Sequence, residues 1–313
     1  MPTGFVDLQV NGYQGINFSS PELDEDACRK ACRLVLSKGT AAFLPTVITS
    51  PEEVYRRNLP LIARTMDDRE FEGRLLGFHI EGPFISPQPG AVGAHRSDWV
   101  RDPDVGLLER MQEWAGGRIR LLTVAAELEG IEALIRRARK LKIVVSLGHQ
   151  MAGPEDLARA VDAGATMLTH LGNGLPGQVD RHRNPLWAAL AEDRLHAMII
   201  TDGHHLPPEV IKTIWRVKGV ERTTIVSDAS SFAGLPPGRY AWQGGEVGIE
   251  ANGRLFDVKK GCLAGSSATM RDCMDYFANL KLATPRELHR VGFENPLEQI
   301  GLSATNVTAP ATT

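Results

Sequence analysis

The chain has 313 residues, of which 42% are hydrophobic and 23% charged, a composition typical of globular proteins. Its 35 basic and 38 acidic residues give a net charge of −3 with no basic block, so nucleic acid is not an expected partner. No apolar run is long enough to span a membrane, and the N-terminal segment MPTGFVDLQV lacks the features of a signal peptide. We therefore expect a cytoplasmic protein that does not associate with membranes.

Eight apolar runs rich in β-branched residues alternate with amphipathic stretches along the chain. The runs predict strands at 4–10, 40–47, 74–80, 119–124, 142–147, 166–170, 195–200 and 223–227. Intervening stretches such as 21–39 and 154–164 begin with proline and acidic residues and end at glycine, which are start and stop signals of helices. Eight β–α units in one chain of this length predict a closed, parallel (β/α)8 barrel.

Two segments differ from this alternation. Residues 239–258 contain glycine pairs and an Asn-Gly turn, which predict a β-hairpin inserted after the eighth strand. Residues 265–300 have a helical pattern, and the small polar residues of 304–313 predict a disordered tail. Because no linker divides the chain, we predict a single domain over residues 1–303.

A polar or ionisable residue lies at the C-terminal end of almost every predicted strand. In (β/α)8 barrels the catalytic residues lie at the C-terminal ends of the strands, which meet at one face. The residues at these positions are Gln9, Thr46, Glu81, His149, His170, Asp202 and Asp228. One polar residue at a strand end could simply serve the following loop. Two histidines, a glutamate and an aspartate at equivalent positions instead predict a site that carries chemistry.

Glu81, His149 and His170 form a predicted metal site. Glu81 is followed by Gly-Pro, and the two histidines follow consecutive strands. Two neutral imidazoles and one carboxylate leave a coordination position open for water, which is the arrangement of a catalytic rather than a structural site. Asp228 could cap the turn after its strand, but beside a cation it could also take a proton from water and pass it to a leaving amine.

Several loop residues near these strand ends are candidate substrate contacts. They are His95 after the third strand, Asn173, Gly174 and Arg183 after the sixth, and Asp202, His204 and His205 after the seventh. A backbone N–H, an arginine and a histidine on neighbouring loops could bind an anion such as a phosphate. Taken singly, each of these residues could equally be a solvated loop residue.

The order of these motifs resembles that of the N-acetylglucosamine-6-phosphate deacetylases, a family of the amidohydrolase superfamily. The matching segments are GFVDLQVNG, HIEGPF, GAH, SLGH, THLGNGLP, TDGHH, VSDAS and LAGSSATM, which span about residues 4 to 270. The resemblance implies a TIM-type barrel of the metal-dependent amidohydrolases and deacetylation of N-acetylglucosamine 6-phosphate to glucosamine 6-phosphate and acetate. It also implies a homodimer.

The resemblance further implies a role for each matched residue. Glu81, His149 and His170 match metal ligands, and Asp228 matches the general base and acid. His95 matches the residue that contacts the acetyl carbonyl and stabilises the oxyanion. The implied contacts to the sugar phosphate are Asn173, Gly174, and Arg183 and His205, the last two resembling ligands that the family supplies across a dimer interface. Leu263, Ala264 and Met270 belong to the segment that closes over the sugar.

The first strand bears on the number of metal ions. Many members of the superfamily have His-x-His in this strand to hold a second metal, whereas this chain has Gln9 and Asn11. Amides are poor ligands for a zinc-like ion. We therefore expect one divalent metal per site, with zinc as the first choice and iron(II) as the alternative.

The chain also departs from the family pattern. The family has a small β-sandwich built from both termini, and we expect this sandwich to be largely missing here. The loop after the second metal histidine usually has an aromatic residue followed by Asn-Ala-Met, whereas this chain reads Gly172-Asn173-Gly174-Leu175. This change is expected to loosen one wall of the pocket. Two alternatives stay open: an amidohydrolase for another N-acylated amino sugar, and a non-catalytic barrel that binds a sugar phosphate.

Overall fold

The computed structural model describes residues 4–308, and its central feature is an eight-stranded parallel sheet rolled into a nearly closed barrel. The strands follow one another in chain order: β1 (Phe5–Val10), β4 (Thr40–Ile48), β5 (Phe78–Glu81), β6 (Ile119–Val124), β7 (Val144–Leu147), β8 (Met167–Leu168), β9 (His196–Ile200) and β10 (Thr223–Val226). The predicted (β/α)8 barrel is therefore confirmed.

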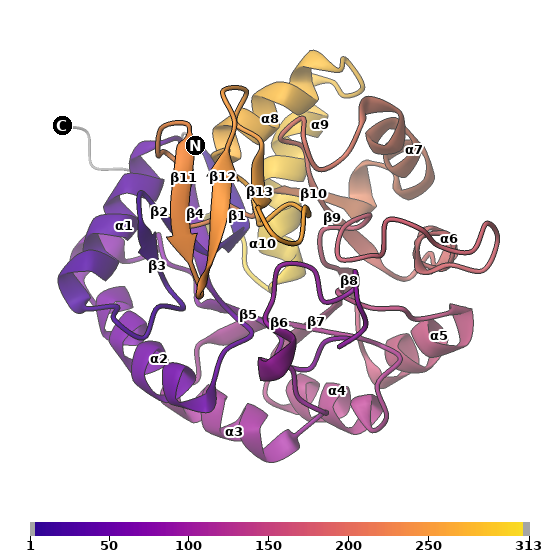
Figure 1. Ribbon diagram of the computed structural model, residues 1–313, viewed down its shortest axis with the longest axis horizontal. Helices are drawn as coiled ribbons and strands as arrows, with labels where there is room; N and C mark the ends of the chain where they lie inside the picture. The colour runs from indigo at the N-terminus through magenta and orange to yellow at the C-terminus, as the bar shows by residue number, and fades with distance from the viewer. Residues whose placement is uncertain (1–3, 309–313) are drawn as a thin grey trace.

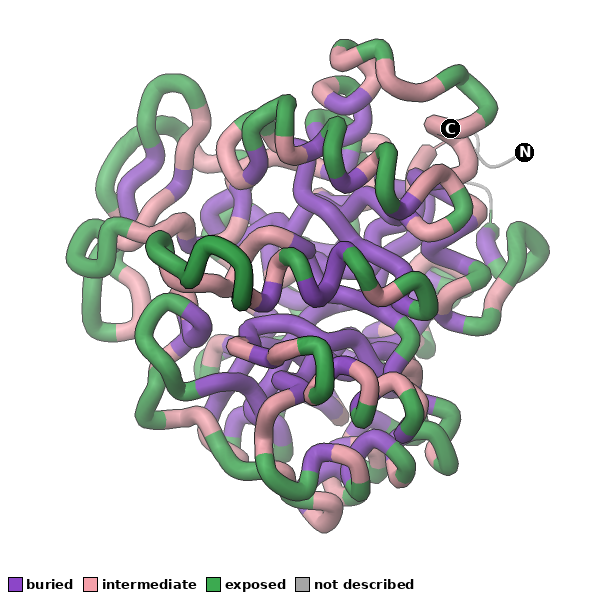
Figure 2. Tube along the Cα trace, turned by 90° about the vertical axis from the view of Figure 1, so that its right-hand side faces the viewer, coloured by how far each residue is buried: buried purple, intermediate pink, exposed green. Residues whose placement is uncertain are grey.

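Helices surround the strands as an outer ring (Figure 1). They are α1 (Glu25–Ser37), α2 (Glu52–Met66), α3 (Val105–Trp114), α4 (Ile131–Lys140), α5 (Pro154–Ala163), α6 (Pro185–Ala191), α7 (Pro208–Lys218) and α8 (Met270–Asn279). Short 3-10 turns occur at η1 (Arg69–Phe71), η2 (Ser97–Trp99) and η3 (Val220–Arg222). Figure 2 shows the consequence for burial, with buried strands at the centre and exposed residues on the outward faces of the helices.

Two of the predicted strands are shorter than their apolar runs. The run 74–80 forms a strand only from Phe78, because Gly77 adopts a φ of 126° and separates this strand from Leu75, which makes an isolated bridge to Phe43. The run 166–170 forms only the two residues of β8, because the backbone turns at His170, where φ is 29°. Hydrophobicity located both strands, but backbone turns decided where the first begins and where the second ends.

The barrel closes between β1 and β10 through side chains as well as backbone. Asp7 accepts hydrogen bonds from the backbone N–H and the hydroxyl of Ser227, and Val10 makes a single parallel bridge to Ala229. The N–H of Asn11 then donates to the Ala229 carbonyl at 2.7 Å. This seam brings the end of the first strand beside the residues that follow the eighth.

The predicted hairpin after the eighth strand is one part of a three-stranded antiparallel sheet. Its strands are β11 (Gly238–Trp242), β12 (Gly245–Ile249) and β13 (Leu255–Asp257). The tight turn lies at Gln243-Gly244, where both φ angles are positive, 49° and 78°. The predicted Asn252-Gly253 turn instead belongs to the longer connection between the second and third strands. A separate two-stranded sheet pairs β2 (Gly12–Tyr13) with β3 (Ile16–Asn17).

The C-terminal segment packs against the barrel at the end where the strands begin. It consists of α9 (Pro285–His289), the π-helical turn η4 (Arg290–Glu294), α10 (Asn295–Gln299) and the 3-10 turn η5 (Ala304–Asn306). Phe293, Leu297 and Val307 join barrel residues such as Leu8 in one buried cluster. Thus 304–308, expected as disordered, form a turn with a buried valine because the barrel end offers an apolar surface. The rest of the predicted tail lies outside the described residues.

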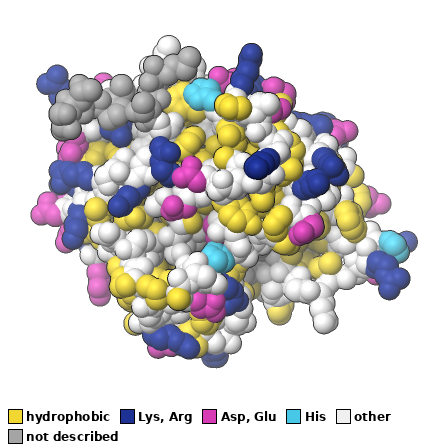
Figure 3. Space-filling view, turned by 90° about the horizontal axis from the view of Figure 1, so that it is seen from above, with side chains coloured by type: hydrophobic (Ala, Val, Ile, Leu, Met, Phe, Trp, Pro, Cys, Tyr) yellow, Lys and Arg dark blue, Asp and Glu magenta, His cyan; other side chains and the backbone are white. Residues whose placement is uncertain are grey.

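The surface carries both signs of charge. Figure 3 shows Lys and Arg interspersed with Asp and Glu over the face that it presents. Among residues 4–308, no helix combines the length and the apolar character that crossing a membrane would require.

Candidate functional site

A cavity of about 240 Å³ opens where the barrel strands end. Its lining includes residues that follow β5, β7, β8, β9 and β10, together with the loop between β5 and η2 and the segment after β13. The predicted site residues in this lining are Glu81, His95, His149, His170, Asn173, Gly174, His205 and Asp228. Leu263 and Ala264 also line it, whereas the predicted residues Arg183, Asp202, His204 and Met270 do not.

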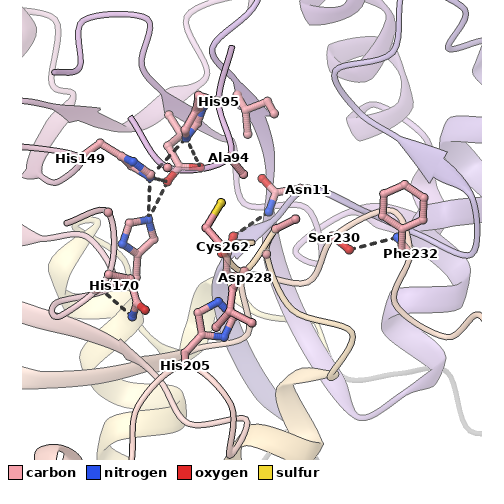
Figure 4. A pocket seen from close by; sticks show the side chains of 18 of the residues that line it. Asn11, Ala94, His95, His149, His170, His205, Asp228, Ser230, Phe232 and Cys262 are labelled. Carbon is pink, nitrogen blue, oxygen red and sulfur yellow. Dashed lines mark hydrogen bonds and ion pairs between the residues drawn. The ribbon is translucent and has the colours of Figure 1, made fainter. Parts of the chain in front are cut away.

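Glu81, His149 and His170 converge on one point in the cavity. The Glu81 Oε1 atom lies 2.9 Å from His170 Nε2 and 3.3 Å from His149 Nε2, and the two Nε2 atoms are 3.1 Å apart. All three side chains are buried, and Figure 4 shows the two imidazoles directed toward each other. The fold therefore brings together the three residues predicted as metal ligands.

The hydrogen bonding of His149 indicates what this cluster can hold. Its Nδ1 atom lies 2.8 Å from the carbonyl oxygen of Ala91, which can only accept, so Nδ1 carries the proton. Nε2 is then the nitrogen that can offer a lone pair, and it faces His170 and Glu81. A ring-nitrogen lone pair, a second imidazole and a carboxylate at this spacing suit a divalent transition-metal ion.

His95 lies on the other side of His149. Its Nε2 atom is 3.2 Å from His149 Nε2 and 3.9 Å from Glu81 Oε2. Potential ligand atoms of His95, His149 and Glu81 all lie within 4.8 Å of one another, so the cavity contains a possible metal-binding group. Glu81 lies nearer to His170 than to His95, which favours His170 as the third ligand. Burial and the neighbouring His149 lower the pKa of His95 to about 3, so its ring is neutral.

The backbone at three of these positions is unusual. His149, His170 and Asp228 each lie two residues beyond a strand, with φ angles of 50°, 29° and 49°. Side chains with a Cβ rarely adopt this left-handed region, and each such residue costs roughly 1–3 kcal/mol. Strain of this kind is typical of functional sites, and here it is repeated at equivalent places in three β–α units.

Asp228 is held across the cavity by the two amides of the first strand. Its Oδ1 atom accepts from Asn11 Nδ2 at 2.7 Å and from Gln9 Nε2 at 3.0 Å, and the Gln9 amide also donates to Glu81 Oε1 at 3.0 Å. No described residue donates to the second oxygen, Oδ2, which is left for a ligand. Gln9 and Asn11 therefore orient the two carboxylates rather than serve as a second pair of metal ligands.

The two carboxylates have opposite pKa shifts. Burial raises the pKa of Glu81, but the neighbouring His149 and His170 side chains outweigh burial and hold this pKa well below its usual range. Burial and the negative charge of Glu81 raise the pKa of Asp228 to about 7. Glu81 is thus the permanent anion of the pair, and Asp228 is the one suited to exchange a proton.

His205 reaches the cavity from the loop after β9, so no second subunit is needed to bring it there. Its Nδ1 atom lies 2.8 Å from Asp202 Oδ2, which also accepts from the Ser266 hydroxyl at 2.9 Å. Burial raises the pKa of Asp202, but the hydrogen bond from His205 outweighs it and keeps the pKa low. The ionised Asp202 therefore directs the other ring nitrogen of His205 toward the cavity.

Asn173 and Gly174 form the wall next to His149. The Asn173 side chain donates to the His170 carbonyl at 3.2 Å. Gly174 has a φ of 64°, and a Cβ at this position would lie 2.9 Å from His149 Nδ1. The close approach of this loop to a predicted ligand therefore requires a glycine.

Arg183 lies on an exposed loop before α6, where its backbone N–H donates to Asp180 at 2.6 Å. The same surface exposes Trp187 and Val179, whose exposed fractions are 51% and 42%. Among the described residues, this arginine makes no side-chain hydrogen bond and does not reach the cavity of its own chain.

Sequence reasoning missed several residues that line or support the cavity. Trp242 at the tip of the β11–β12 hairpin and Phe232 form an aromatic edge, with ring centroids 6.4 Å apart. Cys262 lies near Asn11 and Asp228 in Figure 4. Trp242 and Cys262 lie far from the strand ends in the sequence, and only the prediction of an inserted hairpin and the implied role of Leu263 and Ala264 pointed toward this region.

No family model matches the chain. The chain is 33% identical over 313 residues to N-acetylglucosamine-6-phosphate deacetylase of Bos taurus, covering 96% of this chain and 74% of that protein. It is 34% identical over 281 residues to N-acetylgalactosamine-6-phosphate deacetylase of a Shewanella species, covering 88% and 68%, respectively.

A solved structure shares the fold at similar identity. It is a variant of N-acetyl-D-glucosamine-6-phosphate deacetylase from Mycobacterium smegmatis in complex with N-acetyl-D-glucosamine-6-phosphate. The TM-score is 0.87 at 28% identity, and the match covers 99% of this chain and 81% of that one.

Proposed function

The chain belongs to the N-acetylglucosamine-6-phosphate deacetylase family of the amidohydrolase superfamily, and from this membership we propose that it hydrolyses N-acetylglucosamine 6-phosphate to glucosamine 6-phosphate and acetate. The observation that carries the proposal is the placement of Glu81, His149, His170 and Asp228 in one cavity. Together these residues supply a metal-binding group and a proton-transfer group, which amide hydrolysis requires.

We propose one divalent ion per site, with zinc as the first choice and iron(II) as the alternative. Glu81, His149 and His170 would hold it, since their ligand atoms lie within 3.3 Å of one another. When bound, such an ion supplies Lewis acidity, which lowers the pKa of water and polarises an amide carbonyl. Gln9 and Asn11 are engaged with the carboxylates of Glu81 and Asp228, which supports a single ion.

Asp228 performs the proton transfers in this proposal. Its free Oδ2 accepts a proton from the attacking water as the new C–O bond forms at the acetamide carbon. The same oxygen then protonates the nitrogen as the C–N bond breaks, so that acetate and a free amine leave. Gln9 and Asn11 hold Oδ1 throughout and thereby keep Oδ2 in one orientation.

His95 is proposed to contact the acetyl carbonyl oxygen. Its ring is buried and neutral, so it can donate a hydrogen bond from Nε2 to an oxygen that gains negative charge during attack. A donor of this kind stabilises the transition state more than the ground state and therefore raises kcat. Asn173, Gly174 and His205 border the rest of the cavity, where the sugar phosphate would lie.

Replacing His205 with alanine is expected to raise KM for the phosphorylated sugar by roughly 10- to 100-fold, the loss of one charge-assisted hydrogen bond. The KM for N-acetylglucosamine without phosphate should change little. Steady-state kinetics on both substrates would measure this difference, with His289→Ala as the surface control. Equal losses on both substrates would remove His205 from the phosphate site.

Arg183 is proposed to bind the phosphate of the substrate in the other subunit of a homodimer, since this arginine does not reach the cavity of its own chain. Arg183→Ala and Asp228→Asn subunits should each be weakly active alone. An equimolar mixture of the two subunits should regain up to about one quarter of the activity. Half of the dimers are then mixed, and in each of these one site combines an intact Asp228 with the arginine of the Asp228→Asn subunit. Subunit mixing followed by an acetate assay measures this, and the same experiment with Arg181→Ala tests the arginine two positions before Arg183. No recovery in verified mixed dimers would rule out the exchange.

N-acetylgalactosamine 6-phosphate, the C4 epimer of the proposed substrate, is a second candidate substrate. N-acetylgalactosamine-6-phosphate deacetylases of Escherichia coli O157:H7 and a Shewanella species match this chain at 29% and 34% identity. Acetate release should be measured on both sugar phosphates with protein of known metal content. A higher kcat/KM on N-acetylgalactosamine 6-phosphate than on N-acetylglucosamine 6-phosphate would make the former the substrate. Binding of either sugar without acetate release would support a non-catalytic barrel instead.

A further inference from the structure

Lys260, in the segment after β13, holds the loop that carries His95. Its Nζ atom donates to three consecutive carbonyl oxygens, those of Gly93 at 3.0 Å, Ala94 at 3.3 Å and His95 at 2.9 Å. We propose that Lys260 is a positioning residue that fixes the place of His95 in the cavity. This inference rests on the proposed function for its kinetic consequence, but not for its structural one.

The loop conformation favours a cation. Three neighbouring carbonyl dipoles point their negative ends at one place, which a positively charged donor stabilises better than a neutral one. An ammonium group has three N–H donors and no acceptor, and here each donor meets one of the carbonyls. Gly93 permits this arrangement because its φ is 57°, in the left-handed region. The described residues place no other cationic side chain on these three oxygens.

The opposite side of the same loop touches a predicted metal ligand. The Ala91 carbonyl accepts from His149 Nδ1 at 2.8 Å, and a Cβ on Gly93 would lie 3.1 Å from the His149 ring. The imidazole of His95 then meets His149 edge-on, with ring centroids 4.4 Å apart. The loop is therefore held between His149 on one side and the three-stranded sheet on the other. Removing the lysine takes away three hydrogen bonds on the sheet side and leaves there the bond from Arg96 to the Gln243 carbonyl and the packing of Ala94.

The anchor point of Lys260 is itself rigid. The backbone N–H groups of Lys259 and Lys260 both donate to Asp257 Oδ1, at 2.9 and 2.7 Å. Asp257 ends β13 and pairs with Val247 of β12. The three-stranded sheet is thus a frame that carries the ammonium group to the His95 loop. A residue that lies 165 positions away in the sequence sets the position of His95.

Lys260→Gln is expected to lower kcat by about 10- to 100-fold, the effect of a small misplacement of a catalytic group, with KM changed less than about twofold. Metal content should stay at the wild-type level. Lys260→Arg, which keeps a cation, should recover part of the rate. The matched control is Lys259→Gln, because this adjacent lysine makes no side-chain hydrogen bond to the described residues and should leave kcat unchanged.

A double-variant cycle separates positioning from general destabilisation. If Lys260 acts through His95, then Lys260→Gln should have no further effect on kcat in a His95→Ala background. An undiminished loss in that background would overturn the proposal. Hydrogen–deuterium exchange of residues 88–96 provides a readout that needs no activity, and exchange should be faster in Lys260→Gln than in Lys259→Gln.

The outcomes distinguish this proposal from the proposed function. If the wild-type protein releases no acetate from either sugar, the function fails, and exchange in the 88–96 segment alone decides whether Lys260 holds the loop. Unchanged exchange would overturn the inference even in an active enzyme. Faster exchange with an unchanged kcat would likewise overturn it, because the loop would then not need Lys260 to position His95.

Discussion

Asp228→Asn is expected to lower kcat for acetate release by about 10²–10⁴-fold, the usual contribution of a general acid and base. An asparagine can still accept the hydrogen bonds that Gln9 and Asn11 give to Asp228, so the cavity should keep its shape. It cannot take up the proton of the attacking water or return it to the leaving nitrogen. The metal content should stay unchanged, because Asp228 is not among the proposed ligands.

The measurements are kcat on the sugar phosphate, metal content by elemental analysis and the thermal unfolding midpoint. Asp162→Asn is a suitable control, because Asp162 is exposed and, among residues 4–308, its side chain pairs only with Arg194 on the surface. Activity within a few-fold of wild type would remove Asp228 from the proton-transfer role. A parallel loss of metal would instead make it a ligand.

Glu81→Gln should weaken metal binding by more than the roughly 10- to 100-fold that loss of an outer-shell partner costs, and activity should fall with it. The substitution preserves the size of the side chain but removes the negative charge that His149 and His170 share. Chelation of the wild-type protein should abolish acetate release, and adding zinc or iron(II) should restore it. The unfolding midpoint of the chelated protein should also fall, because ligand binding stabilises the folded state.

Glu127→Gln is the matched control for this variant, because Glu127 is a largely buried carboxylate that accepts from the Met151 N–H but does not line the cavity. Histidine variants would test the ligand set directly. His170→Ala should lose metal, whereas His95→Ala should keep it and lose rate. The opposite pattern would assign His95 to the metal and require a new role for His170.

The position of the candidate site at the C-terminal ends of the strands was predictable from two local signals and one general rule of barrels. Apolar runs locate the strands, and polar residues mark their ends. In a parallel barrel all C-terminal strand ends meet at one face, so Glu81, His149, His170 and Asp228 had to lie near one another. Their convergence in one cavity follows from topology and needed no knowledge of the packing.

Other features depended on contacts that no local pattern contains. Lys260 reads as an ordinary surface lysine until the fold places it beside three carbonyls of a distant loop. Likewise, the polar tail at 304–308 has no helical or apolar pattern, yet Val307 becomes buried because it joins the apolar cluster that Phe293 and Leu297 form with the barrel residues.

The amino-acid sequence by itself determined the barrel, the order of its strands and the chemistry available at its mouth, because hydrophobic periodicity and residue type are local properties. Only the tertiary structure decided which groups orient the site. The chemistry of Gln9 and Asn11 alone excluded them as good metal ligands. Their hydrogen bonds to the carboxylates of Glu81 and Asp228 depend on the seam between β1 and β10. These contacts join residues that are 72 positions apart for Gln9 and Glu81 and 217 positions apart for Asn11 and Asp228, and they depend on distances that only the folded chain defines.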